Sequence, residues 1–499
     1  MDLSKGNFNS IIIFSLSKVI GLSKLGLLEV RMIKSRYPLI FENAFCSHPA
    51  ECAYPDVLII GSGIGLASVP YLRREIKSKL GASLRIVVVD AGPLDIPTHL
   101  GNTPFPRLPI LAAGTERIGG KLSLWGLSTP RPPERMLSLW PYSKDDLGRR
   151  FNFVEEKLGV LDPIPMSGRG LELCLLDLLQ NEFPMYRTRV APLAINRYGH
   201  RYSPLDDLPE LKQLGVQFLA RFHCEHLEMA DCTVSAVSGQ WLDGQSYTLF
   251  PKIIVLAVGI EPSLPLLRQV CCDSLPLEAS DHIRIDLHGS LPRGSFGSKQ
   301  ADELGVAVLL MECSSREHQI PFHLEIKVAP RSLWARGFMV GADNLRGAGD
   351  DETLWVQIQA IAAMHDRFPV MDLLNIGGKI SPVMLPRDIF FHAEIGDLMH
   401  RVASVIGLNP PVFTIRPLLT NHHTYGALRV GQAVSSKFQF HGVNNLYVLP
   451  PTSFVAVDDD ANPALKSLVL SQYAMDSIVS QFGKSTSGLA GATTLEQGQ

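Results

Sequence analysis

Two short apolar stretches, joined by a glycine-rich turn and a helical segment, constrain the fold of this chain more than any other feature. Residues 56–60 read Asp-Val-Leu-Ile-Ile and run into residues 61–65, Gly-Ser-Gly-Ile-Gly. Helix-forming residues occupy 66–80, and a second apolar stretch over 85–90 ends in Asp90. Two apolar strands joined by a glycine turn and a helix indicate a βαβ unit, which implies a parallel sheet.

The glycine turn has the residue pattern of a dinucleotide site. Gly61 allows the tight turn, Gly63 lets the backbone approach a pyrophosphate, and the following helix N-terminus offers N–H groups to phosphates. Asp90 can accept hydrogen bonds from ribose hydroxyls. The usual third glycine position holds Leu66, and Gly65 comes one residue early. Either the turn is one residue shorter, or helix and strand pack less closely; a purely structural turn is the alternative.

Composition narrows the class of protein. The 499 residues include 46 Lys+Arg and 49 Asp+Glu, and the net charge of −3 argues against a nucleic-acid-binding protein. The 46% hydrophobic content excludes a wholly disordered chain. No apolar run approaches about 18 residues, so we expect no transmembrane helix. Residues 10–17 favour an amphipathic helix on the protein body, with a membrane-surface helix or a targeting segment as alternatives.

The eight cysteines form no CxxC pair, so the sequence suggests neither a metal site nor a thioredoxin-type redox site. Reduced thiols are expected, which fits a reducing compartment, and we predict a cytoplasmic protein.

Apolar patterns also place later elements. We expect antiparallel strands within 285–340, for example over 306–311 and 323–328, and a disordered tail after Phe482. The other expected elements are helices over 144–158, 170–182, 264–270 and 463–481, and buried strands over 252–259 and 445–449.

Three further segments carry recognisable motifs. Residues 119–125 read Gly-Gly-Lys-Leu-Ser-Leu-Trp, and residues 255–259 read Val-Leu-Ala-Val-Gly. Residues 423–431 read His-Thr-Tyr-Gly-Ala-Leu-Arg-Val-Gly, and they are followed by a strand at 441–448 and by Ala-Asn-Pro at 461–463. With the βαβ unit, this order resembles the glucose–methanol–choline (GMC) family of FAD-dependent oxidoreductases, and within it the pyranose oxidase branch.

The resemblance implies a GMC-type α/β fold, in which a Rossmann-like FAD-binding domain is interleaved with an α+β substrate domain that carries an antiparallel sheet. It also implies domain boundaries: an N-terminal extension over 1–54, an FAD-binding domain from 55–130, 215–285 and 425–482, a substrate-binding domain from 131–214 and 286–424, and the tail 483–499.

The resemblance further implies oxidation of an alcohol to a carbonyl, with O2 or another compound as electron acceptor. His423 is the expected base that takes the hydroxyl proton while the hydride passes to flavin N5, and His422 is the alternative base. Asn462 is expected to orient the alkoxide, although it also suits a helix N-cap before Pro463. The expected cofactor-binding residues are Gly61, Gly63, Gly65, Asp90, Gly119, Gly120, Ser123, Ala257, Gly259, Asn462 and Pro463.

Two departures from the family pattern matter. Pyranose oxidases carry a flavin-linking histidine where this chain has Leu124, so we expect FAD to be bound non-covalently. The acidic run 458–460 replaces a small, glycine-containing stretch and would favour a cationic substrate such as an amino sugar or aminocyclitol; a solvated turn is the simpler interpretation. A GMC-fold lyase and a non-catalytic flavin-binding protein are the rival functions. The sequence does not decide the oligomeric state.

Overall fold

The computed structural model describes the chain between residues 46 and 492. Apart from gaps of a few residues, it leaves out 93–117, 124–127, 161–168, 195–201, 271–277, 296–306, 315–320, 331–352, 370–385, 416–427 and 455–462.

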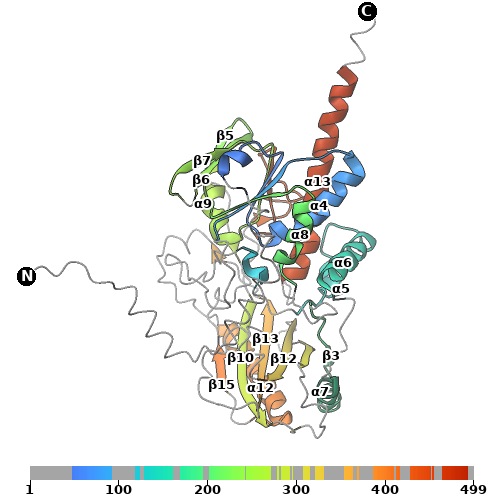
Figure 1. Cartoon of the computed structure of the whole chain (residues 1–499). Helices are drawn as coiled ribbons and strands as arrows, with labels where there is room; N and C mark the ends of the chain where they lie inside the picture. Colours follow the sequence, from blue (N-terminus) through green and yellow to red (C-terminus); the bar gives the residue numbers. More distant parts are fainter. Residues whose placement is uncertain are drawn as a thin grey trace, which may run out of the picture.

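A five-stranded parallel sheet forms the centre of the upper half of the molecule in Figure 1. Its strand order is β17-β8-β1-β2-β4, and all four neighbouring pairs are parallel. The predicted βαβ unit is present as β1, α4 and β2. The strand and helix bounds are β1 (Val57–Ile60), α4 (Ile64–Leu80), β2 (Ile86–Asp90), β4 (Gln217–Ala220), β8 (Ile253–Leu256) and β17 (Leu446–Val448).

The two faces of the parallel sheet are covered differently. Alternate side chains such as Ile59 and Val88 pack into one core with α4, α6 (Lys144–Leu158) and α13 (Pro463–Ala492). Side chains such as Ile60 and Val89 pack on the other face, against α9 (Ile260–Val270) and a three-stranded antiparallel sheet. That sheet consists of β5 (His223–Ala230), β6 (Thr233–Gln240) and β7 (Ser246–Leu249). Burial on both faces explains why the strands are uniformly apolar.

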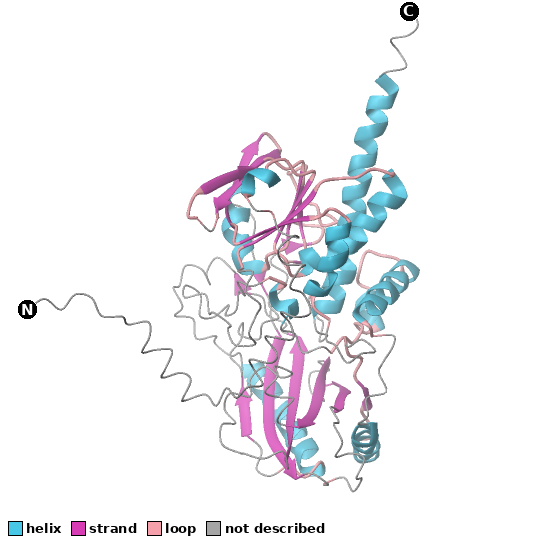
Figure 2. Ribbon diagram, in the orientation of Figure 1, coloured by secondary structure: helices cyan, strands magenta, loops and turns pink. Residues whose placement is uncertain are grey.

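A six-stranded antiparallel sheet forms the lower half of the molecule, with the order β15-β10-β13-β12-β11-β3 (Figure 2). One face packs against α7 (Arg169–Glu182) and α12 (Pro386–Val405) in a separate apolar core. The strands are β3 (Arg187–Val190), β10 (His282–Pro292), β11 (Ala307–Ser314), β12 (Pro321–Pro330), β13 (Thr353–Ala363) and β15 (Val412–Ile415). Helix α6 belongs to the parallel-sheet core, although residues 131–214 are expected in the substrate domain; the domain boundaries stay a prediction.

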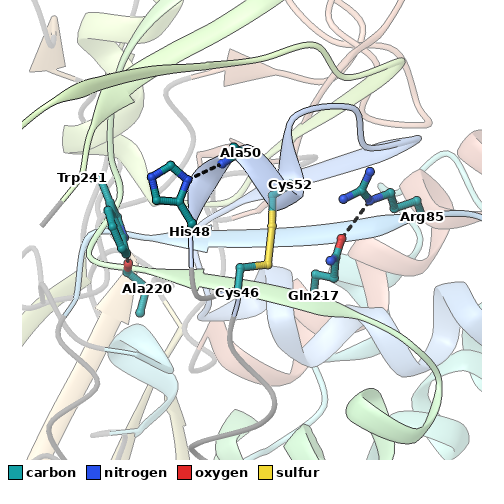
Figure 3. The surroundings of a disulfide bond; sticks show 8 residues. All are labelled: Cys46, His48, Ala50, Cys52, Arg85, Gln217, Ala220 and Trp241. Atoms are coloured by element: carbon teal, nitrogen blue, oxygen red, sulfur yellow. Dashed lines mark hydrogen bonds between the residues drawn. A yellow bond between two sulfur atoms is a disulfide. The ribbon is translucent and has the colours of Figure 1, made fainter.

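Two expectations are corrected. Helix α13 continues to Ala492, so much of the region after Phe482 is helical, because extending a helix whose first turns are already packed costs far less than nucleating one. Cys46 and Cys52 form a disulfide rather than reduced thiols (Figure 3). The Cys46 N–H donates to Phe218 O of β4 at 2.8 Å, and a 3-10 helix at Pro49–Cys52 brings Cys52 back toward it. This pairing depends on tertiary structure that the cysteine spacing does not reveal.

Helix α13 is fixed to α4 and α6 by a partly buried polar network around Asp476. Its carboxylate accepts hydrogen bonds from Arg150 Nη2 at 2.7 Å, Tyr71 Oη at 3.1 Å and Lys79 Nζ at 3.3 Å. Burial and the Asp476 carboxylate raise the pKa of Tyr71 to about 12, so Tyr71 remains a donor at neutral pH.

We predict that Asp476→Asn lowers the free energy of unfolding by about 2 kcal/mol, because three donors lose a charged acceptor. Urea denaturation measures the loss. Glu134→Gln is the control, because its partner Lys144 is largely exposed and the pair should contribute nothing measurable. Equal stability of Asp476→Asn and wild type would contradict the assigned role of this network.

Candidate functional site

The order of the parallel strands creates a switch point beside β1. The chain leaves β1 through α4 to β2 on one side, whereas β8 lies on the other side. Ligands of open parallel sheets bind at such a point, beyond the carboxyl ends of the strands. Residues 61–65 follow β1 here and residues 257–259 follow β8, so the predicted glycine turn lies at the switch point.

The glycine turn packs directly on the backbone that follows β8. Gly61 has φ +103°, and a Cβ at this position would lie 2.7 Å from the Ala257 carbonyl oxygen. A Cβ on Gly65 would lie 2.7 Å from Ile59 Cγ2 and 3.0 Å from Ala257 Cβ. Gly65 therefore provides the close helix–strand packing of a third glycine, so the turn is one residue shorter than the usual one.

The predicted glycine pair, Gly119 and Gly120, lies against the same turn. Both glycines have positive φ, +87° and +50°. A Cβ on Gly120 would lie 3.2 Å from Gly63 Cα, so a side chain there would push the two segments apart. Three segments distant in sequence are thus joined at one sheet edge by backbone contacts.

Asp90, at the end of β2, holds the glycine turn. Its Oδ2 accepts the Ser62 N–H at 2.8 Å and the Ser62 hydroxyl at 2.5 Å, and its Oδ1 accepts the Gly92 N–H at 2.7 Å. The carboxylate therefore lies beside the turn, where a ribose is predicted. Ser62 itself is fully buried and is not among the predicted site residues.

Two neighbouring helices, α4 and α13, point their N-termini toward this edge. The Ser68 and Ser471 hydroxyl oxygens are 2.7 Å apart, and a Cβ on Gly483 would lie 3.3 Å from Leu80, so α4 and α13 run parallel. Gly63, the N-cap of α4, makes no side-chain capping bond. Because a helix N-terminus favours anions, both ends suit a phosphate or a negatively charged ring. Pro463 begins α13, as predicted.

The antiparallel sheet carries a polar face that the sequence analysis missed. The side chains on this face are Arg284, Asp286 and His288 of β10, His323, Glu325 and Lys327 of β12, and Gln357 and Gln359 of β13. None of these residues is more than 7% exposed. We call them the polar sheet face.

Neighbouring members of the polar sheet face interact both within a strand and between adjacent strands. Arg284 Nε donates to Asp286 at 3.0 Å, and Lys327 Nζ lies 2.6 Å from Glu325 and 3.0 Å from Gln359 Oε1. Burial alone would raise the pKa of Glu325, but the Lys327 ammonium and the nearby His323 lower that pKa to about 2.

The polar sheet face also reaches the segment that starts at the glycine pair. Ser128 comes shortly after the glycine pair in the sequence, and its hydroxyl helps to lower the pKa of Glu325. Ser128 is buried and forms a β-bridge with Leu193. Ser128 thus links the polar sheet face to the part of the chain that follows the glycine pair.

Several predicted site residues lie outside the described parts of the chain. These are His422, His423, Asn462, Leu124 and the acidic run 458–460, and the side chain of Ser123 is also left out. Ala257 and Gly259 lie directly after β8, beside the turn, and Gly259 has φ +84°. The catalytic pair stays a prediction.

Among the residues that the structure describes, no cluster of His, Cys, Asp or Glu side chains has the arrangement of a metal site. None of the helices in this described part of the chain combines the length and apolarity required to cross a bilayer.

Comparison with known proteins shows a similar fold and no similar sequence. No family model matches the chain, and no curated protein matches it. A formate oxidase of Aspergillus oryzae RIB40, studied for its FAD modification, is similar in structure, with a TM-score of 0.55 at 12% sequence identity. The match covers 87% of this chain and 99% of the other. The predicted GMC-type α/β fold, with its parallel and antiparallel sheets, is confirmed.

We predict that Glu325→Gln lowers the free energy of unfolding at pH 7 by about 3 kcal/mol, because it leaves Lys327 as an uncompensated buried charge. The folded pKa of Glu325 lies below the unfolded value, so this stabilisation is complete above about pH 4.5 and is lost as pH falls toward 2. Urea denaturation as a function of pH measures both effects.

Glu312→Gln on the same sheet is the control. Its salt bridges to Arg187 and Arg189 are partly exposed, so the loss should stay below about 1 kcal/mol. If Glu325→Gln costs no more than this control at pH 7, the importance of the buried pair is refuted.

Proposed function

We propose that this chain is an FAD-dependent oxidoreductase of the GMC family that oxidises an alcohol group of a small polar molecule to a carbonyl. The observation that carries the proposal is the shortened glycine turn at the switch point, packed against a second glycine pair and the backbone after β8. The similarity to a formate oxidase with modified FAD supports a flavin as the dinucleotide.

The residues present fit FAD. At Gly61, Gly65 and Gly120 a Cβ would come within 3.2 Å of neighbouring atoms, so the backbone segments approach one another as a dinucleotide cradle requires. In this proposal, Gly63 and the α4 N-terminus bind the pyrophosphate, and Asp90, which holds the turn, lies beside the ribose. Gly119, Gly120 and Ser123 then lie along the flavin, together with Ala257, Gly259, Asn462 and Pro463.

The proposed chemistry divides between cofactor and protein. Bound FAD would supply a hydride acceptor. His423 would take the hydroxyl proton of the substrate, because an imidazole titrates near neutral pH. Asn462 would hydrogen-bond the substrate oxygen and stabilise its developing charge. The α13 N-terminus, which follows Asn462 and Pro463, would favour negative charge at the same place.

The polar sheet face supports a hydroxyl-rich substrate. Its guanidinium, ammonium and amide groups donate hydrogen bonds and its carboxylates accept them. The hydroxyls of a polyol or sugar can do both, so such a substrate matches the chemistry of this face. An amino sugar or aminocyclitol remains part of the proposal, because residues 458–460 are acidic. O2 or another compound would reoxidise the flavin.

A redox enzyme is distinguished from its two rivals by what a substrate does to the flavin. A GMC-fold lyase would bind FAD without bleaching it in the presence of substrate, and a non-catalytic protein that does not bind the cofactor would be colourless and resist reconstitution. Flavin absorbance of the purified protein therefore separates the three functions.

We predict that an anaerobic screen of sugars, amino sugars and simple alcohols finds a compound that bleaches the flavin. His423→Ala should slow that reduction by about 100-fold or more, as expected for loss of a general base. His422→Ala is the matched control and should retain most of the rate. A larger effect at His422 would move the base to that residue, and no bleaching by any compound would contradict the oxidoreductase.

We predict that acid precipitation releases the flavin into the supernatant, because Leu124 replaces the histidine that links FAD in pyranose oxidases. Absorbance of supernatant and pellet at the flavin maximum measures the distribution. A yellow pellet after washing would show a covalent link.

A further inference from the structure

Ser62 lies where the glycine turn, the glycine pair and the end of β2 meet. It is fully buried between the two glycines of the turn. Its Oγ accepts the Gly119 N–H at 2.8 Å and lies 2.5 Å from Asp90 Oδ2. One hydroxyl therefore connects the glycine turn, the glycine pair and the end of β2.

The direction of this hydrogen-bond chain follows from the groups themselves. A backbone N–H such as that of Gly119 can only donate, and an ionised carboxylate can only accept. The single Ser62 proton must then point to Asp90. Hydrogen bonds to a charged acceptor are stronger than neutral ones, and a chain of them is polarised in one direction. The arrangement has one hydrogen-bond pattern and fixes the orientation of the Gly119 peptide.

The same chain sets the spacing between the two glycine segments. Gly120 and Gly63 are already so close that a Cβ on Gly120 would lie 3.2 Å from Gly63 Cα. Gly119 is buried, so removing the Ser62 hydroxyl would deprive a buried N–H of its acceptor. The glycine pair would be the segment that shifts, because the turn keeps the bond from the Ser62 N–H to Asp90 at 2.8 Å.

We propose that Ser62 is a positioning residue, which holds the Gly119–Gly120 backbone in the place that the flavin half of the dinucleotide requires. The inference rests on the proposed function. In that proposal the turn and Asp90 serve the ADP half, whereas the glycine pair serves the flavin half. Loss of the Ser62 hydroxyl should therefore weaken binding of FAD much more than binding of ADP.

Ser68 provides a matched control. It is also buried, and its hydroxyl also has two partners, Ile64 O at 2.7 Å and Ser471 Oγ at 2.7 Å. The Ser471 contact joins α4 to α13, and neither partner belongs to the glycine pair. Ser68→Ala therefore measures how losing a buried serine hydroxyl affects binding when the hydrogen-bond chain through Ser62 is left intact.

The experiment compares full-length wild type, Ser62→Ala, Ser62→Thr and Ser68→Ala as apoproteins. Calorimetric titration gives the affinities for FAD and ADP, and thermal unfolding of the apoproteins checks their fold. We expect Ser62→Ala to weaken FAD binding by about tenfold or more while ADP affinity changes less than about threefold. Ser62→Thr, which keeps the hydroxyl, should recover FAD affinity, and Ser68→Ala should leave the ratio of the two affinities unchanged.

The possible outcomes distinguish failure of the role of Ser62 from failure of the proposed function. The role of Ser62 is overturned if Ser62→Ala loses FAD and ADP affinity equally, or if its ratio of FAD to ADP affinity equals that of Ser68→Ala. In either case the binding of FAD by the wild-type protein, and with it the proposed function, is unaffected. A wild-type protein that binds ADP but not FAD overturns the proposed function and this inference together. If Ser62→Ala does not fold, Ser62→Cys is measured in its place. A thiol is a weaker donor and acceptor than a hydroxyl, so Ser62→Cys should also lower the affinity for FAD relative to the affinity for ADP.

Discussion

The contact between the glycine turn and the backbone after β8 is the constraint on which the candidate site depends. Gly61 packs against the Ala257 carbonyl so closely that a methyl group could not be added. This contact joins β1 to β8 at the switch point and leaves the α4 N-terminus uncapped above it. The glycine pair then packs on the other side of the turn. A site of this kind is built from main chain, and it depends on the absence of side chains.

The polar sheet face is built in the opposite way. On the polar sheet face, long charged and amide side chains from three strands fill a buried layer and pair with one another. A main-chain cradle recognises what all dinucleotides share, namely phosphates and a flat ring system. In the proposed enzyme, the main-chain cradle would bind the cofactor and the polar sheet face would select the reacting molecule.

This division also explains what could be predicted from sequence. Backbone requirements leave glycines at fixed spacings, so the turn, the glycine pair and the βαβ unit could be located, as could α6 at Lys144–Leu158. The polar sheet face was missed because alternating polar residues in a strand ordinarily indicate a solvated surface. Its burial comes from tertiary packing. The Cys46–Cys52 disulfide and the length of α13 depend on long-range structure in the same way.

The parallel sheet draws its strands from nearly the whole length of the chain. During synthesis, β1 and β2 emerge long before β17 and the covering helix α13. Until then, the apolar face that α13 will cover has no permanent partner, and such surfaces promote aggregation of partly made chains. The nascent protein should therefore depend on chaperones until α13 has left the ribosome, and a premature stop before α13 should yield insoluble protein rather than a smaller active one.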